Sequence, residues 1–239
     1  MTEKILAALD FPDADTALAM AEQLRGRVGG FKVGKQLFTA RGPKLVRMLA
    51  ERGDRVFLDL KFHDIPNTVA GAIGSAASLG VWMTNVHASG GRAMMTAARE
   101  AADKAAQPGR PRTLVIAVTV LTSLDDAALH EVGVDESAAD HVARLARLAQ
   151  ESGLDGVVCS PQEIELVRRE CGRNFLIVTP GIRGANDAKS DQARTATARG
   201  AIDAGADYLV IGRPITAAAD PAAAAENIAR EIASKERTG

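Results

Sequence analysis

The 239-residue sequence has few aromatic residues, few cysteines and almost no net charge. Aromatic side chains make up 3% of it, whereas alanine occurs 45 times, so much of the apolar content is small and suits closely packed helices. Because 29 basic residues face 30 acidic ones, the sequence argues against a nucleic-acid-binding protein or a polybasic membrane-binding one. Cys159 and Cys171 are too few for a disulfide scaffold and predict reduced thiols in a cytoplasmic protein.

Other signals are absent as well. No apolar run reaches about 18 residues, so no membrane-spanning helix is expected, and the N-terminus lacks the apolar core of a signal peptide. No His-x-x-x-His or Cys-x-x-Cys spacing occurs, which predicts that there is no dedicated transition-metal site. The Gly-x-Ser-x-Gly motif of serine hydrolases is missing too.

The sequence does contain a regular alternation of short apolar runs and helix-like stretches, which predicts strand–helix–strand units and a parallel sheet. The runs are Ile5–Asp10, Gly30–Gly34, Val56–Lys61, Val81–Ala88, Thr113–Val120, Gly156–Ser160, Phe175–Thr179 and Tyr208–Gly212. The helix-like stretches are Ala14–Arg27, Lys44–Arg52, Thr68–Leu79, Gly91–Ala106, Ser137–Ser152, Pro161–Glu170, Thr195–Ala204 and Pro221–Lys235.

Eight such units predict a (β/α)8 TIM barrel, an α/β fold, as a single domain over residues 1–239. The competing layout is an open doubly wound sheet, which usually has fewer strands and a glycine-rich turn after the first one. Here the first run ends in Leu9-Asp10-Phe11-Pro12, without such a turn, which favours the barrel.

Active sites of such barrels lie at the carboxyl ends of the strands, so polar residues there on the inward face are candidate site residues. Asp10 ends the first run on the same face as Leu6 and Ala8, although it could instead cap the following helix. Lys32 lies inside the second run, among small and apolar residues, although it could instead be an edge lysine that reaches solvent.

The third run carries the strongest signal. Asp59 and Lys61 share one face, and Asp64 follows shortly after the strand. The alternative is a structural ion pair. Because buried charges are costly, however, two carboxylates and a lysine at the end of one strand favour a catalytic role. Flanking carboxylates favour the ammonium form of Lys61, which predicts a proton donor, since a Schiff-base lysine needs a desolvated neutral amine. Asp59 would repel a bound anionic group until that group left as a neutral molecule.

An anion site is predicted after the last two strands, where phosphate sites of this fold often lie. The seventh strand leads to Arg183, and the eighth leads to Gly212 and Arg213. Arginine binds phosphate oxygens in a bidentate way and glycine allows close backbone approach, although both arginines could also be ordinary surface residues. His63 and His87 are weaker candidates and are interpreted as structural.

The motif Asp59-Leu60-Lys61-Phe62-His63-Asp64 resembles the D-x-K-x-x-D signature of the orotidine 5′-phosphate decarboxylase family. Further stretches resemble bacterial members in the same order over the whole chain: Leu9-Asp10, Phe31–Gly34, Thr119–Ser123, Thr179–Arg183, Asp191-Gln192 and Ile211–Pro214.

The resemblance implies a cofactor- and metal-independent decarboxylase that converts orotidine 5′-phosphate to UMP and CO2 in pyrimidine biosynthesis. It implies that Lys61 donates a proton to C6 of the pyrimidine, and that Asp59 lies by the scissile carboxylate in a network with Lys32 and Asp64.

The resemblance also assigns binding roles. It implies that Asp10 and Lys32 hold ribose hydroxyls, that Thr122 contacts the base, and that Asp64 and Thr68 reach the site of the second subunit of a homodimer. The phosphate contacts that it implies are Arg183, Gln192, Gly212 and Arg213, with the loop Gly184–Asp191 expected to close over the site.

Two alternatives stay open at this point. Sugar-phosphate decarboxylases of the same superfamily share D-x-K-x-x-D but bind Mg²⁺ through an acidic residue on the second strand, where this chain has Lys32. A non-catalytic barrel that binds a phosphorylated ligand is the other alternative, and the intact Asp59, Lys61 and Asp64 set argues against it.

Overall fold

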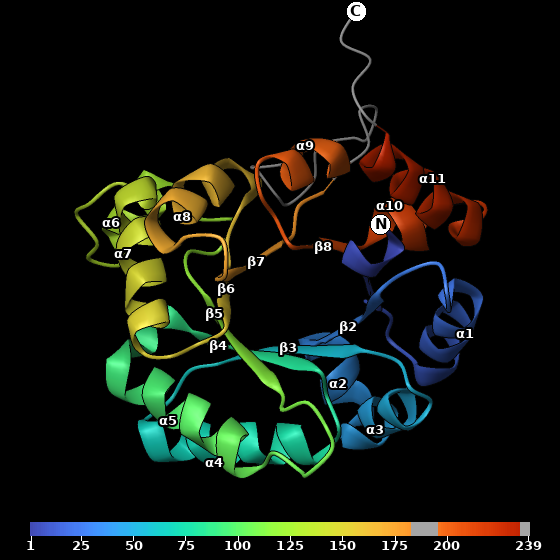
Figure 1. Ribbon diagram of the computed structural model, residues 1–239, viewed down its shortest axis with the longest axis horizontal. Coiled ribbons are helices and arrows are strands. Elements are labelled where there is room, and N and C mark those ends of the chain that lie inside the picture. The colour runs from blue at the N-terminus through green and yellow to red at the C-terminus, as the bar shows by residue number, and fades with distance from the viewer. Residues whose placement is uncertain (183–195, 235–239) are drawn as a thin grey trace, which may run out of the picture.

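The computed structural model describes residues 1–182 and 196–234 (Figure 1). Its strands form a closed parallel barrel in which each strand pairs with the next along the chain and β8 pairs with β1. The strands are β1 (Ile5–Ala8), β2 (Gly30–Gly34), β3 (Val56–Phe62), β4 (Met83–His87), β5 (Leu114–Val118), β6 (Gly156–Val158), β7 (Leu176–Thr179) and β8 (Tyr208–Ile211). The predicted (β/α)8 barrel is therefore confirmed.

Helices surround the barrel on its outside (Figure 1). In the described residues, the α-helices are α1 (Ala14–Leu24), α2 (Lys35–Arg41), α3 (Pro43–Glu51), α4 (Pro66–Ser78), α5 (Gly91–Lys104), α6 (Asp126–Glu131), α7 (Ala138–Glu151), α8 (Ile164–Cys171), α9 (Ala198–Asp203), α10 (Arg213–Thr216) and α11 (Pro221–Ala233). Three 3₁₀ turns are η1 (Thr2–Lys4), η2 (Ala88–Gly90) and η3 (Pro161–Glu163).

The strict alternation of one strand and one helix was wrong in three places. A second helix, α2, precedes the expected one after β2, because Gly42 at φ 67° ends α2 and Pro43 starts α3. The segment between β5 and the expected helix Ser137–Ser152 contains α6, whose first turn is capped by the Asp125 carboxylate. The short helix α10 follows β8 directly.

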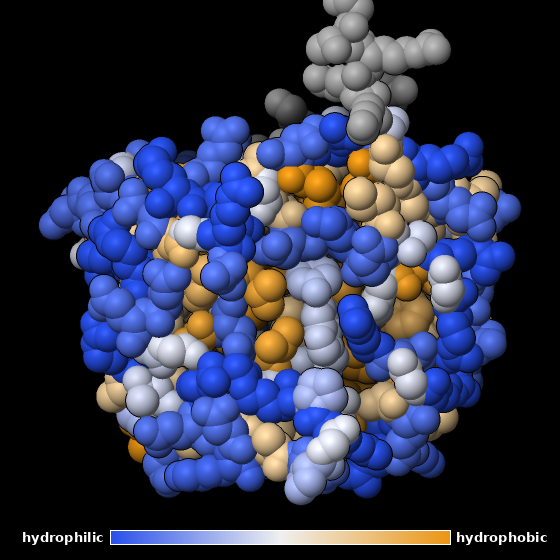
Figure 2. Space-filling model, viewed as in Figure 1, coloured by the Kyte–Doolittle hydropathy of each residue, from blue (hydrophilic) through white to orange (hydrophobic). Residues whose placement is uncertain are grey.

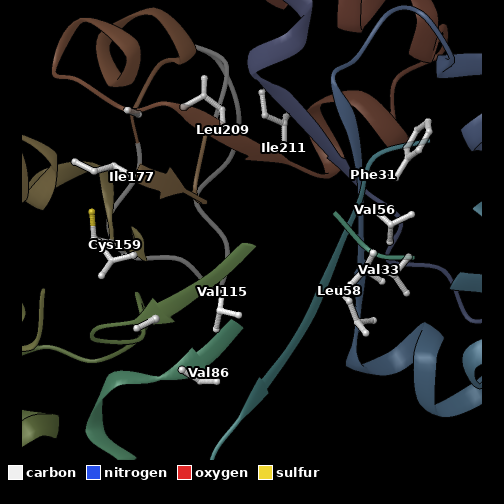
Figure 3. Packing of buried hydrophobic residues seen from close by; sticks show 14 of the residues in the cluster. Phe31, Val33, Val56, Leu58, Val86, Val115, Cys159, Ile177, Leu209 and Ile211 are labelled. Carbon is white, nitrogen blue, oxygen red and sulfur yellow. The ribbon is translucent and has the colours of Figure 1, made fainter. Parts of the chain in front are cut away.

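Alternation along the strands produces two apolar layers. The outer layer lies between strands and helices and contains Ile5, Ala7 and Leu9 from the first strand and its end. Figure 3 shows residues of this layer, among them Phe31 and Leu58, beside the strands from which they come. The inner layer fills the barrel with Leu6, Phe57, Met83, Ile116 and Val178. The barrel interior is therefore a packed core whose inward positions become polar only near the strand ends.

Polar residues dominate the outer surface. On the face drawn in Figure 2, hydrophilic side chains cover most of the peripheral helices, and hydrophobic ones are visible toward the centre. In the part of the chain that the structure describes, no helix combines the length and the apolar character needed to cross a bilayer.

Candidate active site

A cavity of about 450 Å³ opens at the carboxyl ends of the barrel strands. Its size lies in the range of small-molecule sites. Its lining combines charged residues from the first three strands, an apolar floor and backbone from the last two strands. The lining residues are Ala8, Asp10, Lys32, Phe57, Asp59, Lys61, Val118, Val120, Leu121, Thr122, Val158, Cys159, Pro180, Gly181, Ile182, Val210, Gly212, Arg213 and Thr216.

The charged side of the cavity is a row of alternating charges. The Lys32 ammonium lies 2.7 Å from a carboxylate oxygen of Asp10 and 4.0 Å from one of Asp59. The Lys61 ammonium lies 2.6 Å from the other oxygen of Asp59. Gly34 leaves the space for this row, because a Cβ there would come within 3.0 Å of the Lys32 ammonium. The predicted grouping of Asp10, Lys32, Asp59 and Lys61 is thus present in the structure.

Burial and charge act on Asp59 in opposite directions. Its side chain is 13% exposed, and this burial on its own raises the pKa of the carboxyl group. The ammonium groups of Lys61 and Lys32, with hydrogen bonds from Lys61 and Asn85, outweigh burial and hold the pKa of Asp59 below its usual value. Asp59 is therefore a carboxylate at neutral pH.

Strand β3 is irregular where it carries this pair. Its pairing with β4 shifts register between Leu58 and Phe62, and Lys61 has a φ of 54°, the one positive φ among the described non-glycine residues. Asn85 of β4 is fully buried beside this irregularity. Its amide oxygen accepts from the Lys61 backbone N–H at 2.8 Å, and its amide nitrogen donates to Asp59 at 2.7 Å.

Sequence reasoning missed Asn85, although a signal was available. Asn85 lies in the middle of the strand Met83–His87, on the face that points into the barrel. The same test that singled out Asp10, polar side chains on the inward face near a strand end, would have found it.

The other side of the cavity belongs to the last two strands. Gly181 follows β7, Gly212 joins β8 to α10, and Arg213 is the first residue of α10. Thr122, from the segment after β5, lies in the same lining. Gly212, Arg213 and Thr122 are thus brought together around one cavity, whereas Arg183, Gln192 and the loop Gly184–Asp191 lie outside the described residues.

Asp64 and Thr68 lie apart from the cavity. Both are exposed, and neither belongs to its lining. One Asp64 carboxylate oxygen accepts from the Ile65 N–H at 2.6 Å, and Ile65 is 67% exposed just before α4. Within one chain, the predicted network therefore contains Asp59, Lys61 and Lys32 but not Asp64.

His63 and His87 lie close together at the carboxyl ends of β3 and β4, with ring centroids 5.6 Å apart and ring planes tilted by 34°. Neither belongs to the cavity lining. Burial, followed by the charges of His63, Lys35 and Lys61, lowers the pKa of His87 to about 4, so this ring is neutral at pH 7. Among the described residues, no group of three or more His, Cys, Asp or Glu side chains is placed to hold a metal ion.

Comparison with known proteins agrees with this geometry. The sequence profile of the "Orotidine 5′-phosphate decarboxylase / HUMPS family" matches residues 3–228. The orotidine 5′-phosphate decarboxylase of Halorhodospira halophila is 59% identical over 230 residues, which cover 96% of each chain. That of Moorella thermoacetica is 56% identical over 232 residues, 96% of this chain and 92% of the relative.

A solved structure shows the same likeness in three dimensions. The crystal structure of orotidine 5′-phosphate decarboxylase from Lactobacillus acidophilus superimposes with a TM-score of 0.86 at 37% identity, covering 96% of this chain and 99% of that one. The match in sequence extends over nearly the full length, and the match in fold includes the whole barrel. The chain therefore belongs to the orotidine 5′-phosphate decarboxylase family.

Proposed function

We propose that the Asp59–Lys61 pair carries out the reaction of this family, the conversion of orotidine 5′-phosphate to UMP and CO2. The supporting observation is that one cavity holds the Lys61 ammonium, 2.6 Å from Asp59, together with Arg213. In the reaction, the bond from C6 to the carboxylate carbon breaks and CO2 leaves, so the electron pair stays on C6. The Lys61 ammonium then gives that carbon a proton and is later reprotonated from solvent.

Lys61 also acts before it transfers the proton. Its fixed positive charge stabilises the negative charge that develops on C6, and it is held in place before the substrate arrives. Asp59 stays ionised and would lie beside the substrate carboxylate, so the two negative groups repel in the bound state. This repulsion disappears as neutral CO2 forms, so Asp59 favours the transition state over the bound substrate.

The remaining contacts hold the substrate at a distance from the bond that breaks. Gly212 and Arg213 bind the phosphate, at the start of a short helix after the eighth strand, where barrels of this kind often bind phosphate. Lys32 and Asp10 bind the ribose hydroxyls, and Thr122 contacts the base. The apolar floor of Val118, Val158 and Phe57 suits the flat pyrimidine ring.

A Mg²⁺-dependent sugar-phosphate decarboxylase fits this site less well. The side chain from β2 that enters the cavity is Lys32, held by Asp10 and Asp59, and its positive charge would repel a metal ion. The relatives that are 52–59% identical over nearly the whole chain carry the orotidine 5′-phosphate name.

One assay separates these functions. Decarboxylation of orotidine 5′-phosphate is followed by ultraviolet absorbance in the presence of EDTA, and we expect full activity. Activity on a sugar phosphate that appears only with Mg²⁺ would support the metal-dependent alternative. Binding without turnover of either substrate would support a non-catalytic barrel.

We further infer that the active protein is a homodimer with shared sites. Asp64 and Thr68 are exposed and do not belong to the lining of the active-site cavity in their own chain, whereas the resemblance gives them a role in a decarboxylase site. The exposed Ile65 beside Asp64 would be covered in such a dimer. The chain has only two cysteines, Cys159 and Cys171, both buried, and so small a number suits a reducing compartment such as the cytoplasm.

Mixing two inactive variants tests the shared site. Lys61→Ala and Asp64→Ala subunits are unfolded together in equal amounts and refolded. Random pairing gives hybrids in which one of two sites has both intact residues, so about a quarter of the wild-type activity should return. Activity no greater than the sum of the two parents would contradict sharing, while leaving the role of Lys61 intact.

A further inference from the structure

The segment that carries the catalytic pair is not a regular strand. From Leu58 to Phe62 the chain advances four residues, while its partner β4 advances only from Thr84 to Val86. The extra residues bulge, and Lys61 takes a left-handed backbone conformation at φ 54° that is unfavourable for a side chain of its kind. Such a conformation persists only where the surroundings hold it in place.

Asn85 supplies such a restraint with both ends of its amide. The oxygen accepts from the Lys61 backbone N–H at 2.8 Å, and the nitrogen donates to Asp59 Oδ1 at 2.7 Å. The orientation of the amide is determined by its partners, because a backbone N–H needs an acceptor and a carboxylate needs a donor. The oxygen of Asp59 that Asn85 holds is also the one 2.6 Å from the Lys61 ammonium.

Asn85 itself is held firmly. Its side chain is fully buried, and the strand around it pairs with β5 without interruption from Met83 to His87. Asn85 does not belong to the cavity lining, so it acts on the substrate only through the residues that it contacts. A buried amide whose hydrogen bonds go to the backbone of one catalytic residue and the carboxylate of the other fixes their relative position.

We propose that Asn85 is a positioning residue of the decarboxylase, which holds the bulged Lys61 backbone and the Asp59 carboxylate so that the Lys61 ammonium faces C6 of the substrate. This inference rests on the proposed roles of Lys61 and Asp59. It predicts that changes at Asn85 reduce kcat more than they raise KM, because the phosphate contacts at Gly212 and Arg213 lie on the other side of the cavity.

The first test is Asn85→Ala, with Thr84→Val as the matched control. Thr84 is also fully buried on β4, and its hydroxyl donates to the Leu58 carbonyl at 3.0 Å, next to the bulge but away from the charged pair. We expect kcat to fall about 100-fold in Asn85→Ala with a nearly unchanged KM, as misplaced reacting groups produce. Thr84→Val should keep the wild-type kcat even if it loses comparable stability.

The second test uses Asn85→Asp, which preserves shape and replaces the donor that faces Asp59 by a second carboxylate. When two carboxylates are in contact, one of them binds a proton more readily than an isolated carboxylate does. The bound proton lies between the two groups and restores the hydrogen bond that Asn85 donates to Asp59. Lys61 from β3 and Lys32 from β2, together with neutral His87 on β4, are the other titratable groups around this pair. The ratio of kcat in Asn85→Asp to wild-type kcat should therefore rise as the pH is lowered through the range in which both stay folded.

Three results would overturn the inference. A kcat within about twofold of wild type in Asn85→Ala would show that the pair needs no such restraint. An equal loss in Thr84→Val would assign the effect to general weakening of β4, and a ratio independent of pH in Asn85→Asp would remove the link to Asp59. If Asn85→Ala does not fold, the pH ratio of Asn85→Asp decides. These outcomes are separate from failure of the proposed function, which would appear as full activity in Lys61→Ala.

Discussion

Partly buried charged side chains lie at both ends of the barrel, around Asp59 at the carboxyl ends of the strands and around Asp155 and Asp207 at the amino ends. Asp155 precedes β6, and its carboxylate accepts from the Val115 backbone N–H at 2.8 Å and from the Arg112 guanidinium at 2.8 Å. Asp207 repeats the arrangement before β8, with the Ile177 N–H and Arg168, both at 2.8 Å.

The partners differ between the two ends. Asp155 and Asp207 each accept from a neighbouring strand's backbone and pair with arginine, whose planar fork satisfies a carboxylate in a fixed geometry. Asp59 pairs with two lysines and one amide, on a bulged strand and facing a cavity. Lysine is a compact ammonium that can release a proton, whereas arginine cannot at ordinary pH. The amino-end pairs therefore join strands, and the carboxyl-end pair is available for proton transfer.

The largest effect expected from this contrast is the loss of catalytic activity when the proton donor at the carboxyl end is removed. Lys61→Ala should lower kcat by about 10²–10⁴-fold, the range expected for loss of a positioned proton donor. Steady-state turnover of orotidine 5′-phosphate measures it, and Lys44→Ala, an exposed lysine on α3, is the control. Near-wild-type turnover in Lys61→Ala would place the chemistry elsewhere.

At the amino end, the corresponding change should affect stability and not turnover. Asp155→Ala leaves the Arg112 guanidinium, 23% exposed, without its main partner, which costs about 3 kcal/mol of unfolding free energy. Denaturant titration measures it, alongside kcat on the folded variant, which should be unchanged. Asp103→Ala removes a more exposed partner of the same arginine and should cost at most about 1 kcal/mol. A fall in kcat with unchanged stability would contradict the division between the two ends.

At the carboxyl end, loss of a phosphate contact should change a different kinetic constant from loss of the proton donor. Arg213→Ala should raise KM for orotidine 5′-phosphate about 10- to 100-fold, the effect of losing a charge-assisted hydrogen bond. The comparison substrate is orotidine, which has no phosphate, and its kcat/KM should change little in the same variant. A similar loss with both substrates would show that Arg213 does not bind the phosphate.

The barrel could be predicted well from the sequence, because the alternation of strand-like and helix-like stretches can be recognised from neighbouring residues alone. Alternating faces predicted that Asp10, Asp59 and Lys61 point toward the interior, and the structure shows Asp59 and Lys61 in contact there. Contacts between strands were harder to predict. The hydrogen bonds of Asn85 depend on a register shift between β3 and β4 that no residue pattern marks, and α2 depends on the break at Gly42 and Pro43. The role proposed for Asp64 involves a second chain, which one sequence does not place.

The last predicted effect, which vanishes at neutral pH, concerns the histidine next to the charged pair. Burial and nearby positive charges lower the pKa of His87 to about 4 from 6.5, so between these values the unfolded chain binds a proton that the folded chain does not. Stability therefore falls as the pH decreases from about 6.5 to about 4, and the contribution of His87 is fully present above 6.5. In His87→Asn the fall should be shallower by up to one proton, measured by denaturant titration at several pH values. Exposed His130→Asn is the control, and equal slopes in His87→Asn and wild type would show that burial and the nearby charges do not keep the ring of His87 neutral.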